Sequence, residues 1–332
     1  MDREQEEMQF LGFFGIYMES FKVIFAWRKI FSKITLSLIL PLSFIYLVQM
    51  EVSSLFFRKI IHNEIELDHT RSGTPKYEKL SDLISDEWAY FWLFRAAYFT
   101  LFFIFSLLST AAVVYTIACI YTVRELTFKK VMSVVPKVWK RLMVTFLCTF
   151  VAMVVYHVVA FVVFFIWATS IGARDMGIAV FVVLTILYII GFLYLTVIWH
   201  LASIVSVLEE AYGFQAMVKS KNLIKGKLLV ATVIFLKLNI TQQIIQYAFQ
   251  RLVVHGSTMG MASRVVYAII CFLLLSKLFL FGLVIQTVIY FVCKSYHHEN
   301  IDKSALADHL EVYLGEYVPL KAKDVQLEQY HV

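Results

Sequence analysis

Among the polar side chains inside the long apolar stretches of this chain, six have the greatest capacity for chemistry. They are two lysines and four amides: Lys237, Asn239, Gln243, Gln246, Gln250 and Lys277. Polar groups are costly in hydrocarbon and therefore count as default functional hypotheses. The amides follow a three-four spacing, which predicts one stripe along a helix. Lys237 lies about 160° around that helix from Asn239, so the two address different neighbours.

Two interpretations of these residues stay open. Amide stripes join helices through hydrogen bonds of about 0.6 kcal/mol each, which would make the set structural. Alternatively, Lys237 and Lys277 line a polar path for an anionic solute or lipid, because no Asp or Glu lies deep in the same stretches. Glu51, near the outer end of the first stretch, is the one candidate for an acidic partner.

The sequence contains none of the common catalytic or cofactor motifs. It has no HExxH pair, no Cys–His metal cluster, no glycine-rich phosphate loop and no paired carboxylates within the apolar stretches. Acidic residues around Glu64 and His69 match no metal-ligand spacing. We therefore expect no catalytic residue, no metal and no cofactor. The four cysteines are expected to be apolar fillers and not a disulfide framework: Cys119, Cys148, Cys271 and Cys293.

The elements that must position these residues are membrane-spanning helices. Of the 332 residues, 60% are hydrophobic, which is too apolar for a soluble domain of this length. The apolar runs are continuous over more than about 20 residues, whereas barrel strands alternate over about 10. The predicted fold is all-α: a polytopic helical membrane bundle of about six transmembrane helices. The predicted spans are 34–56, 89–122, 142–170, 177–208, 228–250 and 264–293.

The distribution of lysine and arginine predicts the orientation. Basic residues concentrate before the first span and in the links 123–141 and 209–227, whereas acidic residues outnumber basic ones in the outer loop 57–88. Short basic flanks stay in the cytoplasm, so both termini are predicted to be cytoplasmic. Pro136 is expected to break the first link. The resulting organisation is a cytoplasmic N-terminus, a transmembrane domain and a cytoplasmic tail, over 1–33, 34–293 and 294–332.

The net charge of +6 is explained by membrane lipids. Basic residues at the inner leaflet meet anionic lipid, so no direct nucleic-acid binding is expected. A protein partner would bind the cytoplasmic loops or the tail, where residues 317–320 match a tyrosine-based sorting pattern after an expected amphipathic helix over 304–317. No cleavable signal peptide is expected, because the first residues are acidic. The compartment is the plasma membrane or an endomembrane such as the ER, Golgi or vacuole.

Residues Phe10 to Phe31 predict an amphipathic helix before the first span. Seven apolar residues recur at helical spacing, while the charged residues fall mostly elsewhere: Phe10, Phe13, Phe14, Tyr17, Phe21, Ile24 and Phe25. This pattern is typical of an interfacial helix lying in the membrane plane. Such a helix either anchors the first span or takes a lipid-sensing or partner-binding role.

The link 209–227 carries a pattern of one acidic residue, small residues and a closing glycine: Glu210, Gly213, Ala216, Ser220, Leu223 and Gly226. Ala216 and Ser220 are four apart, so they share a helical face on which backbones can approach closely. The segment resembles one shared by a broad membrane superfamily that includes bacterial YciC-type proteins and the membrane domain of some glycerophosphodiester phosphodiesterases. That resemblance implies a membrane segment and no phosphodiesterase activity, because the catalysis belongs to a separate soluble domain.

Three longer segments extend a resemblance over nearly the whole chain: MDREQEEMQFLGFFGIYMESFKVIFAWRKIF, HNEIELDHTRSGTPKYEKLSDLIS and VMSVVPKVWKRLM. They resemble a plant family of six-span membrane proteins that genome descriptions call polyadenylate-binding-protein-binding proteins. The resemblance implies a protein partner and no enzymatic activity.

These observations predict an integral multi-pass membrane protein without enzymatic activity that organises lipids or protein partners. The alternative is a carrier or channel for an anionic solute or lipid, with a polar path between the fifth and sixth spans. Lys237 and Lys277 would carry that alternative, because both are cations without a nearby carboxylate in the spans.

Overall fold

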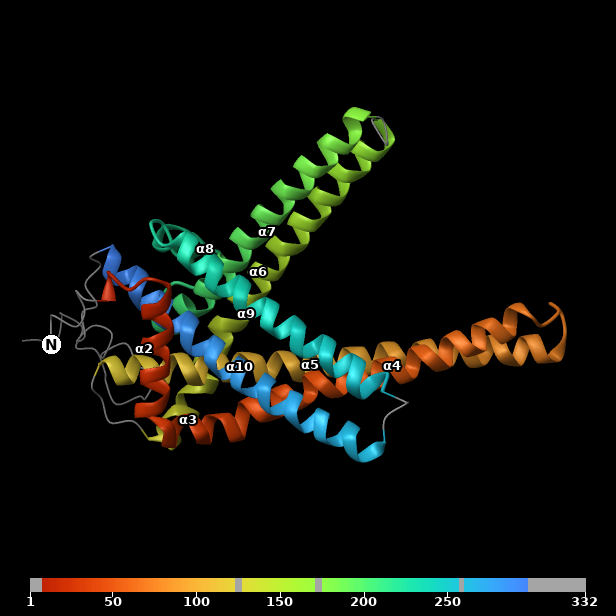
Figure 1. Ribbon diagram of the computed structural model, residues 1–332, viewed down its shortest axis with the longest axis horizontal. Coiled ribbons are helices and arrows are strands. Elements are labelled where there is room, and N and C mark those ends of the chain that lie inside the picture. Colours follow the sequence, from red (N-terminus) through yellow and green to blue (C-terminus); the bar gives the residue numbers. More distant parts are fainter. Residues whose placement is uncertain (1–7, 123–126, 171–174, 257–259, 298–332) are drawn as a thin grey trace, which may run out of the picture. The chain divides into compact units, whose positions relative to one another are not determined.

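The described part of the chain is built from helices (Figure 1). The structure is a computed structural model and describes residues 8–122, 127–170, 175–256 and 260–297, among which no strand occurs. This confirms the all-helical prediction for these residues, whereas the expected tail helix and sorting pattern lie outside them. The helices and π-helical turns are α2 (Phe13–Ala26), α3 (Arg28–Ile34), η1 (Thr35–Ile39), α4 (Leu40–Asp68), α5 (Pro75–Tyr121), α6 (Phe128–Ser170), α7 (Asp175–Leu208), α8 (Phe214–Leu223), α9 (Leu228–Phe249), η2 (Gln250–Val254) and α10 (Met261–Tyr296).

Six helices among the described residues are long and apolar enough to cross a membrane, in the predicted number and order. Each exceeds the roughly 20 residues that a hydrocarbon layer of about 30 Å requires. The excess arises because polar residues such as Lys and Glu are good helix formers and continue a helix past its apolar part. The six stretches are Arg28–Asp68, Pro75–Tyr121, Phe128–Ser170, Gly177–Leu208, Leu228–Val254 and Met261–Tyr296.

The chain divides into two compact units. Unit 1 comprises Met1–Leu11, Val114–Gly226 and Tyr290–Val332, and unit 2 comprises Gly12–Val113 and Lys227–Ile289. The small-residue motif of link 209–227 therefore belongs to unit 1. The amide-rich helix α9 belongs to unit 2, together with the N-terminal helices.

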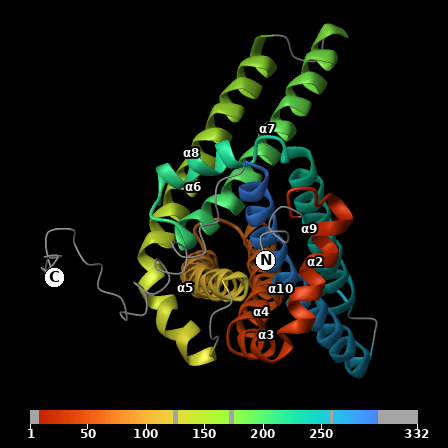
Figure 2. The same cartoon turned by 90° about the vertical axis from the view of Figure 1, so that its left-hand side faces the viewer.

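In unit 1, α6 and α7 lie side by side as an antiparallel hairpin (Figure 1, Figure 2). The Tyr156 hydroxyl donates to the carbonyl oxygen of Tyr188 at 2.6 Å, and the Trp167 indole N–H donates to that of Gly177 at 3.0 Å. Gly191 permits the close approach, because a side chain there would collide with the Tyr156 ring. Polar atoms of this hairpin thus find partners on the neighbouring helix.

In unit 2, α4 and α5 form a second hairpin, which includes most of the expected outer loop 57–88. Only residues 69–74 are not helical in that range. Asn63 Nδ2 donates to both carboxylate oxygens of Glu87, at 3.0 and 2.8 Å, and Lys59 Nζ lies 2.9 Å from the same carboxylate. These contacts join the polar ends of the two helices across the hairpin.

The predicted break at Pro136 is wrong, because α6 continues through it. Residues 128–141, which we expected in a link, form the first part of this helix. A proline removes one helical hydrogen bond, but the residues around Pro136 are packed tightly enough to keep the helix intact. The buried neighbours are Val134, Val135 and Val138.

The expected amphipathic helix over Phe10 to Phe31 consists of two helices, α2 and α3, which meet at Trp27. Ile16, Ser20 and Val23 form the buried face of α2, and none of them is among the seven apolar residues of the predicted face. Part of the aromatic face of α2 packs against another helix of the protein. The ring centroid of Phe21 lies 4.4 Å from that of Phe281 in α10.

Candidate functional site

The small-residue motif forms α8 and the two turns that flank it. Gly213 precedes α8 with a φ of +62°, and Gly226 follows it with a φ of +88°. Both values lie in the left-handed region that favours glycine. Between them, Ala216, Ser220 and Leu223 are buried on one face of the helix.

Polar contacts fix α8 to its neighbours within unit 1. The Ser220 hydroxyl donates to the carbonyl oxygen of Ile198 in α7 at 3.0 Å. The Gly213 N–H donates to the hydroxyl of Thr145 in α6 at 2.7 Å, and the same hydroxyl lies 2.6 Å from that of Ser206. The motif therefore holds α6, α7 and α8 together, which is a structural role.

The acidic residue with the most contacts in this region is Glu209 and not Glu210. Glu210 is exposed, whereas the Glu209 side chain is only 12% exposed. The Glu209 carboxylate accepts a hydrogen bond from the Tyr290 hydroxyl at 2.5 Å and lies 3.2 Å from Lys294 Nζ. It also forms an ion pair with Lys219. Lys294 is 85 residues away, so no local sequence signal could reveal this cluster.

The environment of Glu209 acts on its pKa in both directions. Burial raises the pKa of the carboxyl, while the hydrogen bonds from Lys219 and Tyr290 and the charge of Lys294 lower it. The net result is a pKa below the ordinary value, so the carboxylate form is stabilised. A carboxylate held between two ammonium groups is a fixed ion cluster and not a poised proton donor.

The amides of α9 do not act as one stripe. Gln246 Oε1 accepts a hydrogen bond from the Tyr46 hydroxyl at 2.9 Å, and Gln242 Nε2 donates to that hydroxyl at 3.3 Å. Asn239 donates to Phe235 in its own helix at 2.9 Å. The side chains of three of the predicted amides are exposed: Asn239, Gln243 and Gln250. The spacing of polar residues singled out Gln246 as a candidate, but it gave no indication of its partner Tyr46, which lies in α4.

The two lysines of the apolar helices α9 and α10 lie in different surroundings. Lys237 Nζ lies over the aromatic rings of Phe13 and Tyr17, at 5.4 and 5.2 Å from their centroids. Burial raises the pKa of the Tyr17 hydroxyl. The side chain of Lys277 is exposed, and neither lysine forms an ion pair with a described residue.

Glu51, the one candidate for an acidic partner of the lysines, lies beside a different cation. Its carboxylate lies 3.8 Å from the guanidinium of Arg264, which also donates to the carbonyl oxygen of Val253 at 2.9 Å. The side chains of Glu51 and Arg264 are each partly exposed. Glu51, the one candidate for an acidic partner of the two lysines, is thus paired with Arg264.

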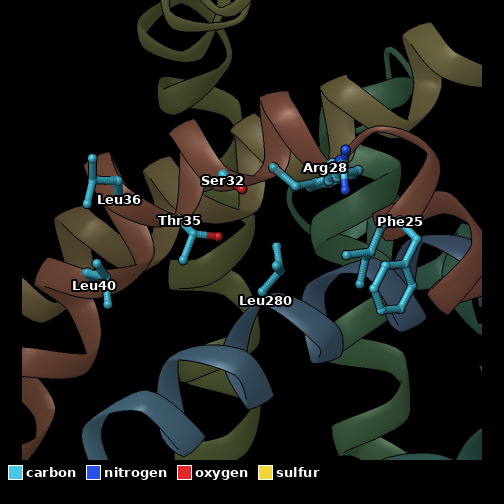
Figure 3. A pocket seen from close by; sticks show the side chains of 9 residues that line it. Phe25, Arg28, Ser32, Thr35, Leu36, Leu40 and Leu280 are labelled. Carbon is cyan, nitrogen blue, oxygen red and sulfur yellow. The ribbon is translucent and has the colours of Figure 1, made fainter. Parts of the chain in front are cut away.

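A groove of about 340 Å³ lies within unit 2, between the N-terminal helices and α10 (Figure 3). Phe25 and Arg28 stand at one end, and Leu36 and Leu40 stand at the other. Thr35 lies between them. The sequence indicated an amphipathic segment here but no groove, because Leu280 of α10 completes the lining.

No group of three or more His, Cys, Asp or Glu side chains that could hold a metal ion occurs within residues 8–122, 127–170, 175–256 and 260–297.

The sequence matches the protein family described as "Domain of unknown function (DUF8558)" over residues 1–330. The chain belongs to this family. No curated protein and no solved structure matches it. The family description specifies no ligand or reaction, so the geometry above carries the functional argument.

Proposed function

We propose that this chain is an integral, multi-pass membrane protein without enzymatic activity that organises lipids or protein partners. The observation that carries the proposal is the surface of the α6–α7 hairpin. Of the most apolar window in each helix, only 6% in α6 and 0% in α7 is buried inside the protein. Such an apolar surface is far larger than monomeric proteins expose to water, and lipid is the solvent that suits it.

The polar groups within the hairpin support the same environment. The hydroxyl of Tyr156 and the indole N–H of Trp167 are paired with backbone carbonyls across the helices. The exposed hydroxyls of Thr169 and Thr185 bond to carbonyls of their own helices, at 3.0 and 2.8 Å. Side chains that satisfy their hydrogen bonds internally are suited to hydrocarbon, where water cannot do so.

The proposed orientation places both termini in the cytoplasm, with the α4–α5 turn on the opposite side. Lysines and arginines at the start of the first apolar helix and around α8 support it, since short basic flanks are retained in the cytoplasm. The membrane would be the plasma membrane or an endomembrane. The resemblance to the plant six-span family supports a protein partner at the cytoplasmic loops or the tail.

Alkaline carbonate extraction of membranes that carry the full chain tests this proposal. We expect the protein to stay in the pellet, because six apolar helices hold it in lipid. Release into the supernatant, as for a peripheral protein, would contradict the proposal. A soluble protein and a known integral protein in the same membranes provide the two reference points.

A second candidate, a carrier or channel for an anionic solute or lipid, is favoured by one observation. Lys237 and Lys277 are exposed cations of α9 and α10 that form no ion pair with a described residue. Flux of an anionic solute into liposomes that contain the purified chain tests it. Flux that is lost in Lys277→Leu or Gln246→Leu but kept in Gln243→Leu supports transport, whereas correct insertion without any flux contradicts it.

A further inference from the structure

The groove beside the start of the first apolar helix combines a cation, a buried hydroxyl and an aliphatic end (Figure 3). Arg28 belongs to α3, Thr35 to η1 and Leu280 to α10. All of these residues lie in unit 2. The three kinds of group follow one another along the groove, and this order matches an amphiphile better than a small polar solute.

The cationic end suits a phosphate. The Arg28 side chain is exposed and forms no ion pair with a described residue. Its guanidinium carries N–H donors in a planar fork that fits a phosphate in a bidentate manner. Lys29 and Lys33 on the same helix add positive charge, so an anion is attracted to this end.

The middle of the groove offers a hydroxyl that lacks a partner. Thr35 Oγ1 is buried and makes no hydrogen bond within the protein. A threonine in a helix commonly bonds to the carbonyl three or four residues earlier, and Thr35, like Thr116, lacks this bond. A buried unpaired hydroxyl is unfavourable, and a ligand oxygen would remove the penalty. Thr35 follows Arg28 by seven residues, or about 10 Å along a helix.

The far end of the groove is aliphatic. Leu36, which is 70% exposed, and Leu40 stand at this end, whereas Leu280 stands between Thr35 and Phe25 (Figure 3). None of these side chains could hold an ion or a polar solute, whereas an acyl chain would cover them and remove apolar surface from contact with headgroups. Free phosphate would leave these aliphatic side chains uncovered.

We propose that this groove binds a phospholipid with an anionic headgroup. The phosphate contacts Arg28, an oxygen of the glycerol ester region accepts from the Thr35 hydroxyl, and an acyl chain lies against Leu36, Leu40 and Leu280. The inference rests on the proposed membrane function and names the class of lipid that the protein binds. It also gives the amphipathic N-terminal segment a lipid-recognising role beyond anchoring.

Photo-crosslinking of the full chain in phosphatidylcholine vesicles tests the inference. The vesicles contain a minor fraction of either phosphatidylserine or phosphatidylcholine with the same photoreactive acyl chain, and labelled peptides are mapped by mass spectrometry. We expect phosphatidylserine to label residues 24–40 and the region of Leu280 about fivefold more than phosphatidylcholine does. Equal labelling of the groove by both lipids would overturn the inference.

Two variants and one matched control separate the groove from general attraction to a charged surface. We expect Arg28→Gln to abolish the preference for phosphatidylserine and Lys29→Gln to keep most of it, because Lys29 is an exposed neighbour that adds charge but does not line the groove. Thr35→Val should reduce labelling without lowering the unfolding midpoint, since it removes an unpaired hydroxyl. Equal losses in Arg28→Gln and Lys29→Gln would contradict the site.

Further results distinguish a phospholipid from free phosphate as the ligand. They also distinguish failure of the lipid site from failure of the proposed membrane function. If inorganic phosphate displaces the lipid probe at matched concentration, the groove is a phosphate site and the lipid proposal is wrong. Labelling of the exposed α6 and α7 surfaces without labelling of the groove contradicts only the lipid site. A chain that is released by alkaline carbonate and labelled nowhere contradicts the membrane function itself.

Discussion

Glu209 joins side chains from two separate parts of unit 1. Its carboxylate contacts Lys219 in α8 as well as Tyr290 and Lys294 near the end of α10. The carboxylate is largely buried, and a buried charge is costly unless it is paired. The two ammonium groups offset this cost. A single residue therefore links α8 to the end of α10.

We expect Glu209→Gln to lower the free energy of unfolding by about 2 kcal/mol, because the amide no longer offsets the charge of two nearby ammonium groups. Glu210→Gln is the matched control, since Glu210 is exposed, and it should change the value by less than about 0.5 kcal/mol. Denaturant unfolding of the purified full chain in detergent micelles measures both. Equal effects of the two substitutions would show that the cluster does not contribute.

The stabilisation by Glu209 should depend on pH in one direction. The folded-state pKa of its carboxyl is lowered from the ordinary value of 4.5, so the unfolded state takes up a proton first as the pH falls. The contribution is complete above the unfolded-state pKa and is lost as the pH falls through the folded-state pKa. We therefore expect the difference in unfolding midpoint between the natural chain and Glu209→Gln to be constant near neutral pH and to shrink below about pH 4.5. A difference that grows in acid would contradict this assignment.

At the scale of elements, α9 is attached to α4 by a polar contact that involves Gln246 and Tyr46. We expect Gln246→Leu to destabilise the chain by about 0.6 kcal/mol, the average value of a hydrogen bond between helices in a membrane. Gln243→Leu removes the same group from an exposed position three residues away and should not destabilise. Unfolding of both variants in detergent, measured beside Tyr46→Phe, gives the comparison. A larger loss in Gln243→Leu would mean that the exposed amides are the ones in contact.

The α6–α7 hairpin leads to a prediction about insertion. Val158 is exposed near the middle of the apolar part of α6. We expect Val158→Arg to reduce the membrane-inserted fraction, because an arginine at the centre of a span costs about 2.5 to 3.5 kcal/mol. Phe214→Arg is the control, since Phe214 is an exposed residue of α8 outside the six apolar stretches. The fraction that resists carbonate extraction measures both, and equal insertion of the two variants would place α6 outside the lipid.

At the scale of the whole molecule, the six membrane crossings that we propose require both termini on one side. We expect glycosylation acceptor sites placed at either terminus or in the turn before Gly213 to stay unmodified, and one inserted within residues 69–74 to be modified. The turn before Gly213 shares the side of the termini because four helices precede it. Modification of one terminus but not the other would require an odd number of crossings and would contradict the proposed organisation.

The sequence by itself determined that the chain has six long apolar helices in a given order. It also determined that the segment before them is amphipathic, and that Gly213 and Gly226 stand at turns. These properties are local: apolarity over about 20 residues, a period of 3.6 and the backbone freedom of glycine can all be evaluated without knowing what packs against what.

Only the tertiary structure decided which polar residues meet. It buried Glu209 and exposed Glu210, brought Gln242 and Gln246 to Tyr46, and directed Glu51 to Arg264. It also placed Leu280 beside the N-terminal helices, which completes the groove. These outcomes depend on contacts between residues far apart in sequence. A one-residue difference along a helix turns a side chain by about 100°, so its partner is set by the neighbouring helices and not by its own segment.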